Sequence, residues 1–124
     1  MTALLITLAG GLGAALRFWA DGAIRARWQP ALPVATLTIN TAGSLLLGVL
    51  VGLLGAGALG PDTVAVLGVG LCGGFTTFST AMVEVARMWR DGHRRRCLAT
   101  LALMTVASTV AAAAGMAAAT ALAT

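Results

Sequence analysis

The sequence is poor in charge, and the few charges it has are one-sided. Of its 124 residues only four are acidic, none is lysine or tyrosine, and all eight basic residues are arginines. The one histidine and the distant Cys72 and Cys97 make neither a zinc-binding cluster nor an expected disulfide. The chain also lacks a Ser/His/Asp set and a phosphate-binding glycine loop, so we do not expect an enzyme. Four acidic side chains are too few for the surface of a soluble domain of this length.

What the chain has instead is apolar sequence. It is 59% hydrophobic, with a mean hydropathy of +0.94. Four apolar segments approach the ~20 residues that a helix needs to cross a bilayer, and none alternates as barrel strands do. The first lacks a basic start, so we expect no cleaved signal peptide. We predict an all-α membrane protein that is a single domain over residues 1–124, with spans at about 3–20, 32–54, 63–83 and 98–122.

The connections between these spans are expected to be short. The first covers Asp21–Ala31, where Pro30 marks the approach to the second span, and the third covers Val85–Arg96. Between the second and third spans lies a Gly/Pro-rich loop that ends at Asp62, a plausible helix N-cap.

All the arginines lie in or beside the first and third connections, at positions 17, 25, 27, 87, 90, 94, 95 and 96. With four spans, these two connections share one face of the membrane. The termini and the second connection share the other face and carry no arginine. The positive-inside rule then places the first and third loops in the cytoplasm and both termini outside the cell membrane. We assign the positive charge to topology and lipid headgroups, and expect no nucleic acid partner.

Small and polar residues form stripes on two spans. On the second span Asn40, Ser44, Gly48 and Gly52 recur every four residues and share one face. On the fourth span the corresponding stripe contains Thr105, Ser108, Thr109 and Ala112. Such stripes either allow close helix packing or line a polar track, and their hydroxyls often bond back to their own helix.

Two charges lie within or at the edge of a span, where a charge is costly. Arg17 either turns toward the nearer membrane surface or serves a site. Glu84 either pairs with Arg87, which lies one turn later, or lies at the mouth of a pore.

The third span contains the sequence GGFTTFST at residues 73–80. Two glycines weaken a helix by about 1 kcal/mol each relative to alanine. A broken helix would free carbonyl oxygens that can bind a cation such as Na⁺, and nearby hydroxyls can satisfy other freed groups. The positive edge of the Phe78 ring can favour an anion. From this pattern alone, both a functional break and a kinked packing helix remain open.

Three stretches together resemble the CrcB/Fluc family of fluoride channels: 10–18 (GGLGAALRF), 36–44 (TLTINTAGS) and 73–80. The resemblance covers nearly the whole chain. It implies four-helix subunits with a broken third helix, which assemble as antiparallel dimers with two passive fluoride pores at the subunit interface. Such channels keep cytoplasmic fluoride low.

The resemblance also implies roles for individual residues. Backbone carbonyls of Gly73 and Thr76 would hold a structural Na⁺ that is not transported. Arg17 and Glu84 would lie at the vestibules. The fluoride pore would be lined by Asn40, Phe78, Thr77, Ser79, Thr80 and Ser108.

Two features depart from the family pattern. The family usually has a second phenylalanine where this chain has Ala81. The arginines on one face also favour a single orientation, whereas an antiparallel homodimer needs both. We therefore weigh a heterodimer with an oppositely oriented homologue, which would supply the missing phenylalanine, against a homodimer.

Two other classes of protein remain as alternatives. A proton-coupled exporter of the small multidrug resistance type has a similar size, but it needs a carboxylate in its first span, where this chain has Arg17 and no acid. A non-conducting membrane subunit would use its stripes for packing only.

Overall fold

The computed structural model describes residues 1–28 and 31–123, in which all regular structure is helical. Four helical stretches are long and apolar enough to cross a membrane, as the composition predicts. The third of them is divided into several segments, one of which, η1, is π-helical. The elements are α1 (Thr2–Arg27), α2 (Val34–Gly55), α3 (Pro61–Val64), η1 (Ala65–Cys72), α4 (Gly73–Phe75), α5 (Phe78–Arg90) and α6 (Arg94–Ala123).

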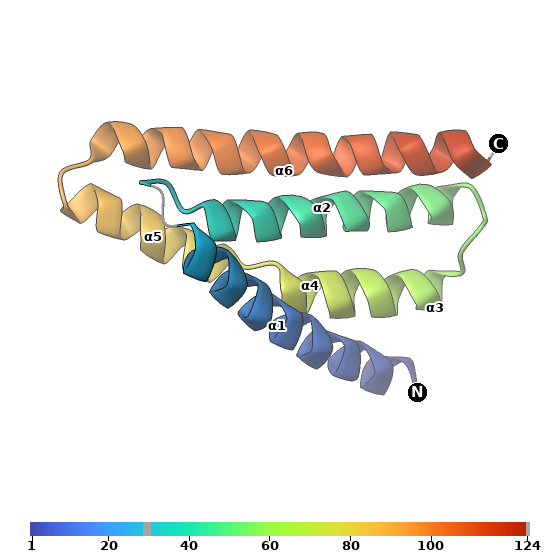
Figure 1. The fold of residues 1–124 in the computed structure, drawn as a ribbon. Helices are drawn as coiled ribbons and strands as arrows, with labels where there is room; N and C mark the ends of the chain where they lie inside the picture. The colour runs from blue at the N-terminus through green and yellow to red at the C-terminus, as the bar shows by residue number, and fades with distance from the viewer. Residues whose placement is uncertain (29–30, 124) are drawn as a thin grey trace.

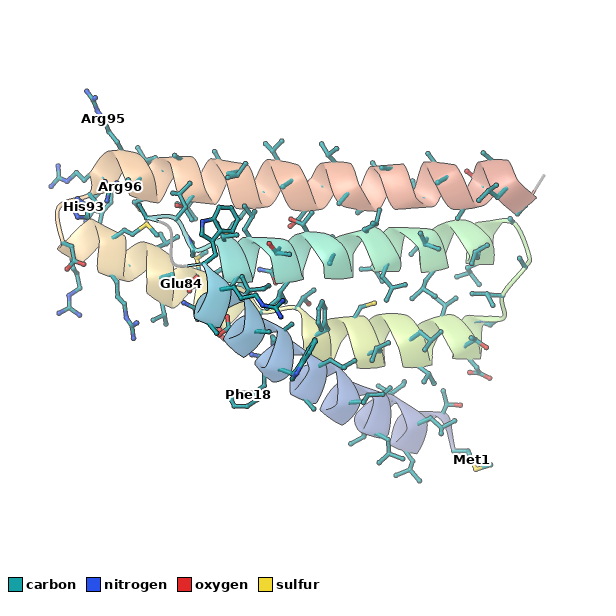
Figure 2. All side chains as sticks on the ribbon, viewed as in Figure 1. Met1, Phe18, Glu84, His93, Arg95 and Arg96 are labelled. Carbon is teal, nitrogen blue, oxygen red and sulfur yellow. The ribbon has the colours of Figure 1, made fainter. Side chains whose placement is uncertain are left out.

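The helices form a bundle in which α2 lies between α6 and the α3–α4 stretch, while α1 crosses obliquely (Figure 1). The ends of α1 and α5 and the start of α6 lie at one end of the bundle. Both termini and the α2–α3 connection lie at the other end. Figure 2 shows His93, Arg95 and Arg96 at the end opposite Met1. The two arginine-rich regions therefore gather at one end of the molecule.

The predicted first and third connections are too long. Helix α1 continues to Arg27, and Arg25 Nε lies 2.7 Å from Asp21 Oδ2 one turn earlier. Such a pair stabilises a helix beyond its apolar part. Helix α5 likewise continues to Arg90, so only residues 91–93 separate it from α6. Pro30 lies outside the described residues.

The start of the third stretch also differs from the prediction. Asp62 is not the N-cap, because Gly60 holds that position and no side chain caps the helix. Asp62 lies in the first turn instead, where its negative charge still faces the positive end of the helix dipole.

Glycines bring α2 and α6 into close contact. A Cβ atom on Gly48 would collide with the carbonyl oxygen of Ala112, and one on Gly52 would lie 2.6 Å from the carbonyl oxygen of Met116. Gly115 of α6 faces the carbonyl oxygen of Leu45 in the same way. This end of the small-residue stripe on α2 is therefore a packing seam.

A second glycine seam joins α1 to the third stretch. A Cβ atom on Gly70 would lie 2.8 Å from the carbonyl oxygen of Ile6, and one on Gly74 would collide with the backbone of Gly10. The two seams hold the third stretch and α6 close to α1 and α2.

We predict that Gly48→Ala lowers the stability of the fold, because the added methyl group overlaps the Ala112 carbonyl of α6. Overpacking of this kind costs about 1–3 kcal/mol. The midpoint of thermal unfolding in detergent micelles should fall. Gly11→Ala is the matched control, because no heavy atom lies within 4 Å of the added Cβ. It should be neutral or stabilising, by up to about 1 kcal/mol. Equal midpoints for the two variants would contradict the packing seam.

Candidate functional site

The helical backbone of the third stretch is interrupted at two residues. Helix α4 ends at Phe75 and α5 begins at Phe78. Between them Thr76 has φ −80° and ψ 160°, and Thr77 has φ −147° and ψ 118°, both extended conformations. The Thr76 N–H still donates to the Cys72 carbonyl oxygen at 2.9 Å, as in a helix. The helical pattern stops at Thr77, whose backbone groups therefore need partners from elsewhere in the protein.

Asn40 of α2 provides the partners for Thr77. The backbone N–H of Thr77 donates to Asn40 Oδ1 at 2.8 Å, and Asn40 Nδ2 donates to the Thr77 carbonyl oxygen at 2.9 Å. One amide side chain thus satisfies both backbone groups of an extended residue. A carboxamide has two N–H donors, so one of them remains for another ligand.

Threonine hydroxyls complete the interruption. Thr76 Oγ1 donates to the Cys72 carbonyl oxygen at 2.9 Å. Thr77 is the N-cap of α5, where its Oγ1 accepts from the Thr80 backbone N–H at 3.2 Å and lies 3.0 Å from Thr80 Oγ1. Ser79 is exposed, and its Oγ lies 3.4 Å from Thr77 Oγ1. These hydroxyls therefore anchor both helix ends next to the interruption.

The interruption forms part of the wall of a groove of about 470 Å³ between α2, α6 and the third stretch, including its α5 segment. Phe78 is 78% exposed at this groove. Ser79, Thr80, Arg17 and Glu84 do not line it. The groove brings together six of the predicted site residues, which are Asn40, Gly73, Thr76, Thr77, Phe78 and Ser108.

The hydroxyl stripe of α6 faces the same groove. Thr105 Oγ1 donates back to the Leu101 carbonyl oxygen at 2.9 Å, as membrane hydroxyls often do. Ser108 is half-buried in the wall, and its hydroxyl makes no hydrogen bond within the described part of the chain. Its hydroxyl is therefore available to a ligand in the groove. Ser44, on the α2 stripe, also lines the groove. The α2 stripe is thus a groove wall at one end and a seam at the other.

Arg17 contacts the third stretch before the interruption, and Glu84 lies after it. Arg17 Nε donates to the Gly74 carbonyl oxygen at 3.2 Å, so this side chain does not simply turn to the membrane surface. Of the two alternatives for Glu84, pairing with Arg87 does not occur. Glu84 Oε1 accepts instead from Arg25 Nη2 at 2.7 Å, because the longer α1 carries Arg25 to α5. The sequence patterns do not reveal Arg25, although its spacing from Asp21 hints at a helix there.

A metal ion in this region would depend on backbone oxygens. The described residues contain no cluster of histidine, cysteine, aspartate or glutamate that could hold a metal, and Cys72 and Cys97 are free and buried. Gly73 and Thr76 both line the groove. In a continuous helix their carbonyl oxygens would accept from the N–H groups of Thr77 and Thr80, which donate instead to Asn40 Oδ1 and Thr77 Oγ1. Carbonyl oxygens of this kind suit a hard cation such as Na⁺.

Comparison with known proteins agrees with this arrangement. The family model described as "CrcB-like protein, Camphor Resistance (CrcB)" matches residues 4–116. "Fluoride-specific ion channel FluC 2" of Cutibacterium acnes is 51% identical over 92 residues, which cover 70% of this chain and 72% of the relative.

Two relatives align over almost the full chain. "Fluoride-specific ion channel FluC 1" of Symbiobacterium thermophilum is 42% identical over 122 residues, covering 94% of this chain and 96% of the relative. The protein of the same name from Frankia casuarinae is 38% identical over 122 residues, with 94% and 95% covered. With the family model matching all four membrane-crossing stretches, this chain is a member of the CrcB-like family.

Proposed function

We propose that this chain is a subunit of a channel that conducts fluoride passively across the cell membrane and keeps its cytoplasmic concentration low. The names of the aligned relatives support the choice of ion. The observation that carries the proposal is the groove in which Asn40, Phe78 and Ser108 meet at the interruption of the third stretch. The family membership disfavours the alternative of a multidrug exporter.

The chemistry of the groove suits a small, strongly hydrated anion. The second N–H of Asn40 and the hydroxyl of Ser108 are donors that can replace water around fluoride. The exposed ring of Phe78 offers a positive edge without a full charge. Such weak, repeated interactions let an ion enter and also leave. The hydroxyls of Thr77, Ser79 and Thr80 would assist at the interruption.

The third stretch would act as one broken membrane-crossing helix. Its length and hydropathy over Pro61–Arg90 are sufficient for a single crossing, and the interruption then lies within the bilayer. Arg17 and Glu84 would lie at the vestibules, on either side of the narrow section. Arg95 and Arg96 lie at the end of the bundle opposite Met1 (Figure 2), and Arg25 of the first arginine-rich region contacts Glu84 of α5, which supports cytoplasmic first and third connections and external termini.

A second subunit would complete the pore. The single chain forms an open groove and not an enclosed pore, and Phe78 is 78% exposed at its wall, so a partner subunit would close it. The partner would be an antiparallel copy of this chain or an oppositely oriented homologue. Ala81 lines the groove and is 4% exposed. A homologue with phenylalanine at this position would supply the second aromatic ring.

We further propose that a structural Na⁺ bound by the carbonyl oxygens of Gly73 and Thr76 joins the two subunits. One chain offers two such oxygens, fewer than a cation of this kind requires, so the partner would supply the remainder. The ion would offset the electrostatic cost of exposing these carbonyls within the bilayer.

The first prediction concerns transport by the chain alone. Liposomes that contain the purified protein and are loaded with sodium fluoride should release fluoride rapidly, while liposomes loaded with sodium chloride should retain chloride. Fluoride-selective and chloride-selective electrodes measure the two releases. If fluoride is retained, the assay is repeated with a co-expressed homologue of opposite arginine bias. Retention in both assays would refute the channel and favour a non-conducting subunit.

The second prediction concerns Asn40→Asp. A fixed negative charge in the groove repels an anion, by about 4 kcal/mol at 4 Å for an effective dielectric constant of 20. Aspartate also cannot donate to the Thr77 carbonyl oxygen as the amide does. Fluoride flux should be abolished. Asn40→Ala separates the two causes, because it removes the hydrogen bonds without adding charge. Unchanged flux in the aspartate variant would remove Asn40 from the pore.

The third prediction concerns sodium. If Na⁺ is held between subunits, the midpoint of thermal unfolding in detergent should rise with sodium concentration and not with N-methylglucamine at equal ionic strength, because a ligand that binds only the folded state stabilises it. Equal midpoints in the two cations would argue against the sodium site.

A further inference from the structure

Two arginines of α1 reach opposite sides of the interruption. Arg17 Nε bonds to the Gly74 carbonyl oxygen upstream of it, and Arg25 Nη2 bonds to Glu84 Oε1 downstream of it. Among the described residues, these are the hydrogen bonds that join α1 to the Pro61–Arg90 stretch. Figure 2 shows Glu84 beside the end of α1. A single straight helix therefore spans the interruption and holds both of its sides.

The guanidinium of Arg25 is well placed to hold α5. Its Nε lies 2.7 Å from Asp21 Oδ2 on its own helix, while its Nη2 lies 2.7 Å from Glu84 Oε1. The bond to Asp21 thereby holds the planar guanidinium in the orientation that faces Glu84 of α5. The side chain of Glu84 is only 13% exposed. Removing one member of a pair whose other member is so desolvated costs more than removing a member of an exposed surface pair.

Helix α5 needs such a constraint. Because Thr76 and Thr77 are extended, helical hydrogen bonding does not continue from α4 into α5. The direction of α5 is then set by side-chain contacts. Phe78 is the first residue of α5, and Glu84 lies six residues later, about 9 Å along the helix axis. The contact at Glu84 thus acts together with the packing of α5 against α6 to fix the angle of the helix that presents Phe78 to the groove.

Glu84 also depends on this partner electrostatically. Its Oε2 atom is buried and has no hydrogen-bond partner among the described residues, so Arg25 supplies the one donor that its carboxylate has there. Loss of Arg25 would leave a largely buried carboxylate without compensation, and such a group drives local rearrangement.

We propose that Arg25 is a positioning residue, which acts through Glu84 to hold α5, and with it Phe78, in the orientation required for conduction. This inference rests on the proposed channel function for its effect on flux. Its effect on α5 itself does not depend on transport.

The first test follows backbone hydrogen–deuterium exchange over residues 78–90 of the full-length protein in detergent micelles. Arg25→Gln should raise exchange there severalfold, with α2 unchanged. Glu84→Gln should have a similar effect, and the double variant should add little, because both changes remove one interaction. Arg27→Gln is the matched control. It removes the same charge from the same end of α1, but Arg27 is exposed and has no ion pair among the described residues.

The second test measures fluoride efflux from liposomes for the same variants and for Arg25→Lys. Arg25→Gln should lower the flux on the order of tenfold, as a displaced binding group can, while Arg27→Gln should match the unmodified protein. Arg25→Lys should recover part of the flux, because lysine keeps the charge but cannot bridge two carboxylates in a fixed plane.

The outcomes separate the two proposals. If Arg25→Gln and Arg27→Gln give equal exchange in α5, or if flux is equal in the two variants of a conducting protein, the positioning role is refuted. If the unmodified protein does not conduct under any condition, the channel function fails, and the exchange experiment alone decides whether Arg25 holds α5.

Discussion

The fold depends on one constraint, that a backbone group within a bilayer must find its hydrogen-bond partner inside the protein. The extended Thr77 in the third stretch would violate this constraint without Asn40, which bonds to both of its backbone groups. The same requirement explains why threonines surround the interruption. It also ties the groove to α2, because Asn40 can reach Thr77 only if α2 lies beside the third stretch.

The glycine seams provide that placement. Gly48 and Gly52 bring α2 against α6, and Gly70 and Gly74 bring the third stretch against α1. In lipid, no hydrophobic effect pulls helices together, so close van der Waals contact must do so. The stripe on α2 therefore combines two tasks along one helix face. Its glycines fix the helix, and Asn40 at its other end uses that position to support the interruption.

The number and approximate positions of the four long helical stretches could be predicted from sequence, because each apolar segment must be long enough to cross a bilayer. Helix ends could not, because helices such as α1 continue past their apolar part, as far as Arg27. Six residues of the groove could be predicted from the chemistry of their side chains. The hydrogen-bond partners of Asn40 and Arg25 could not be predicted, because they lie 37 and 59 positions away in the sequence. Local patterns do not determine such pairs, and the sequence therefore offered Arg87, one turn later, as the possible partner of Glu84 and not Arg25.

The π-helical segment η1 has a consequence for how this sequence can tolerate changes in length. A π-helix accommodates more residues per turn than an α-helix. Deleting one residue from Ala65–Cys72 would let the segment relax to an α-helix, whereas the same deletion from an α-helical segment turns the residues that follow by about 100°. The first change leaves Gly74 facing Gly10, which it contacts closely, almost as before. Loss of one residue should therefore be tolerated better in η1 than in α2.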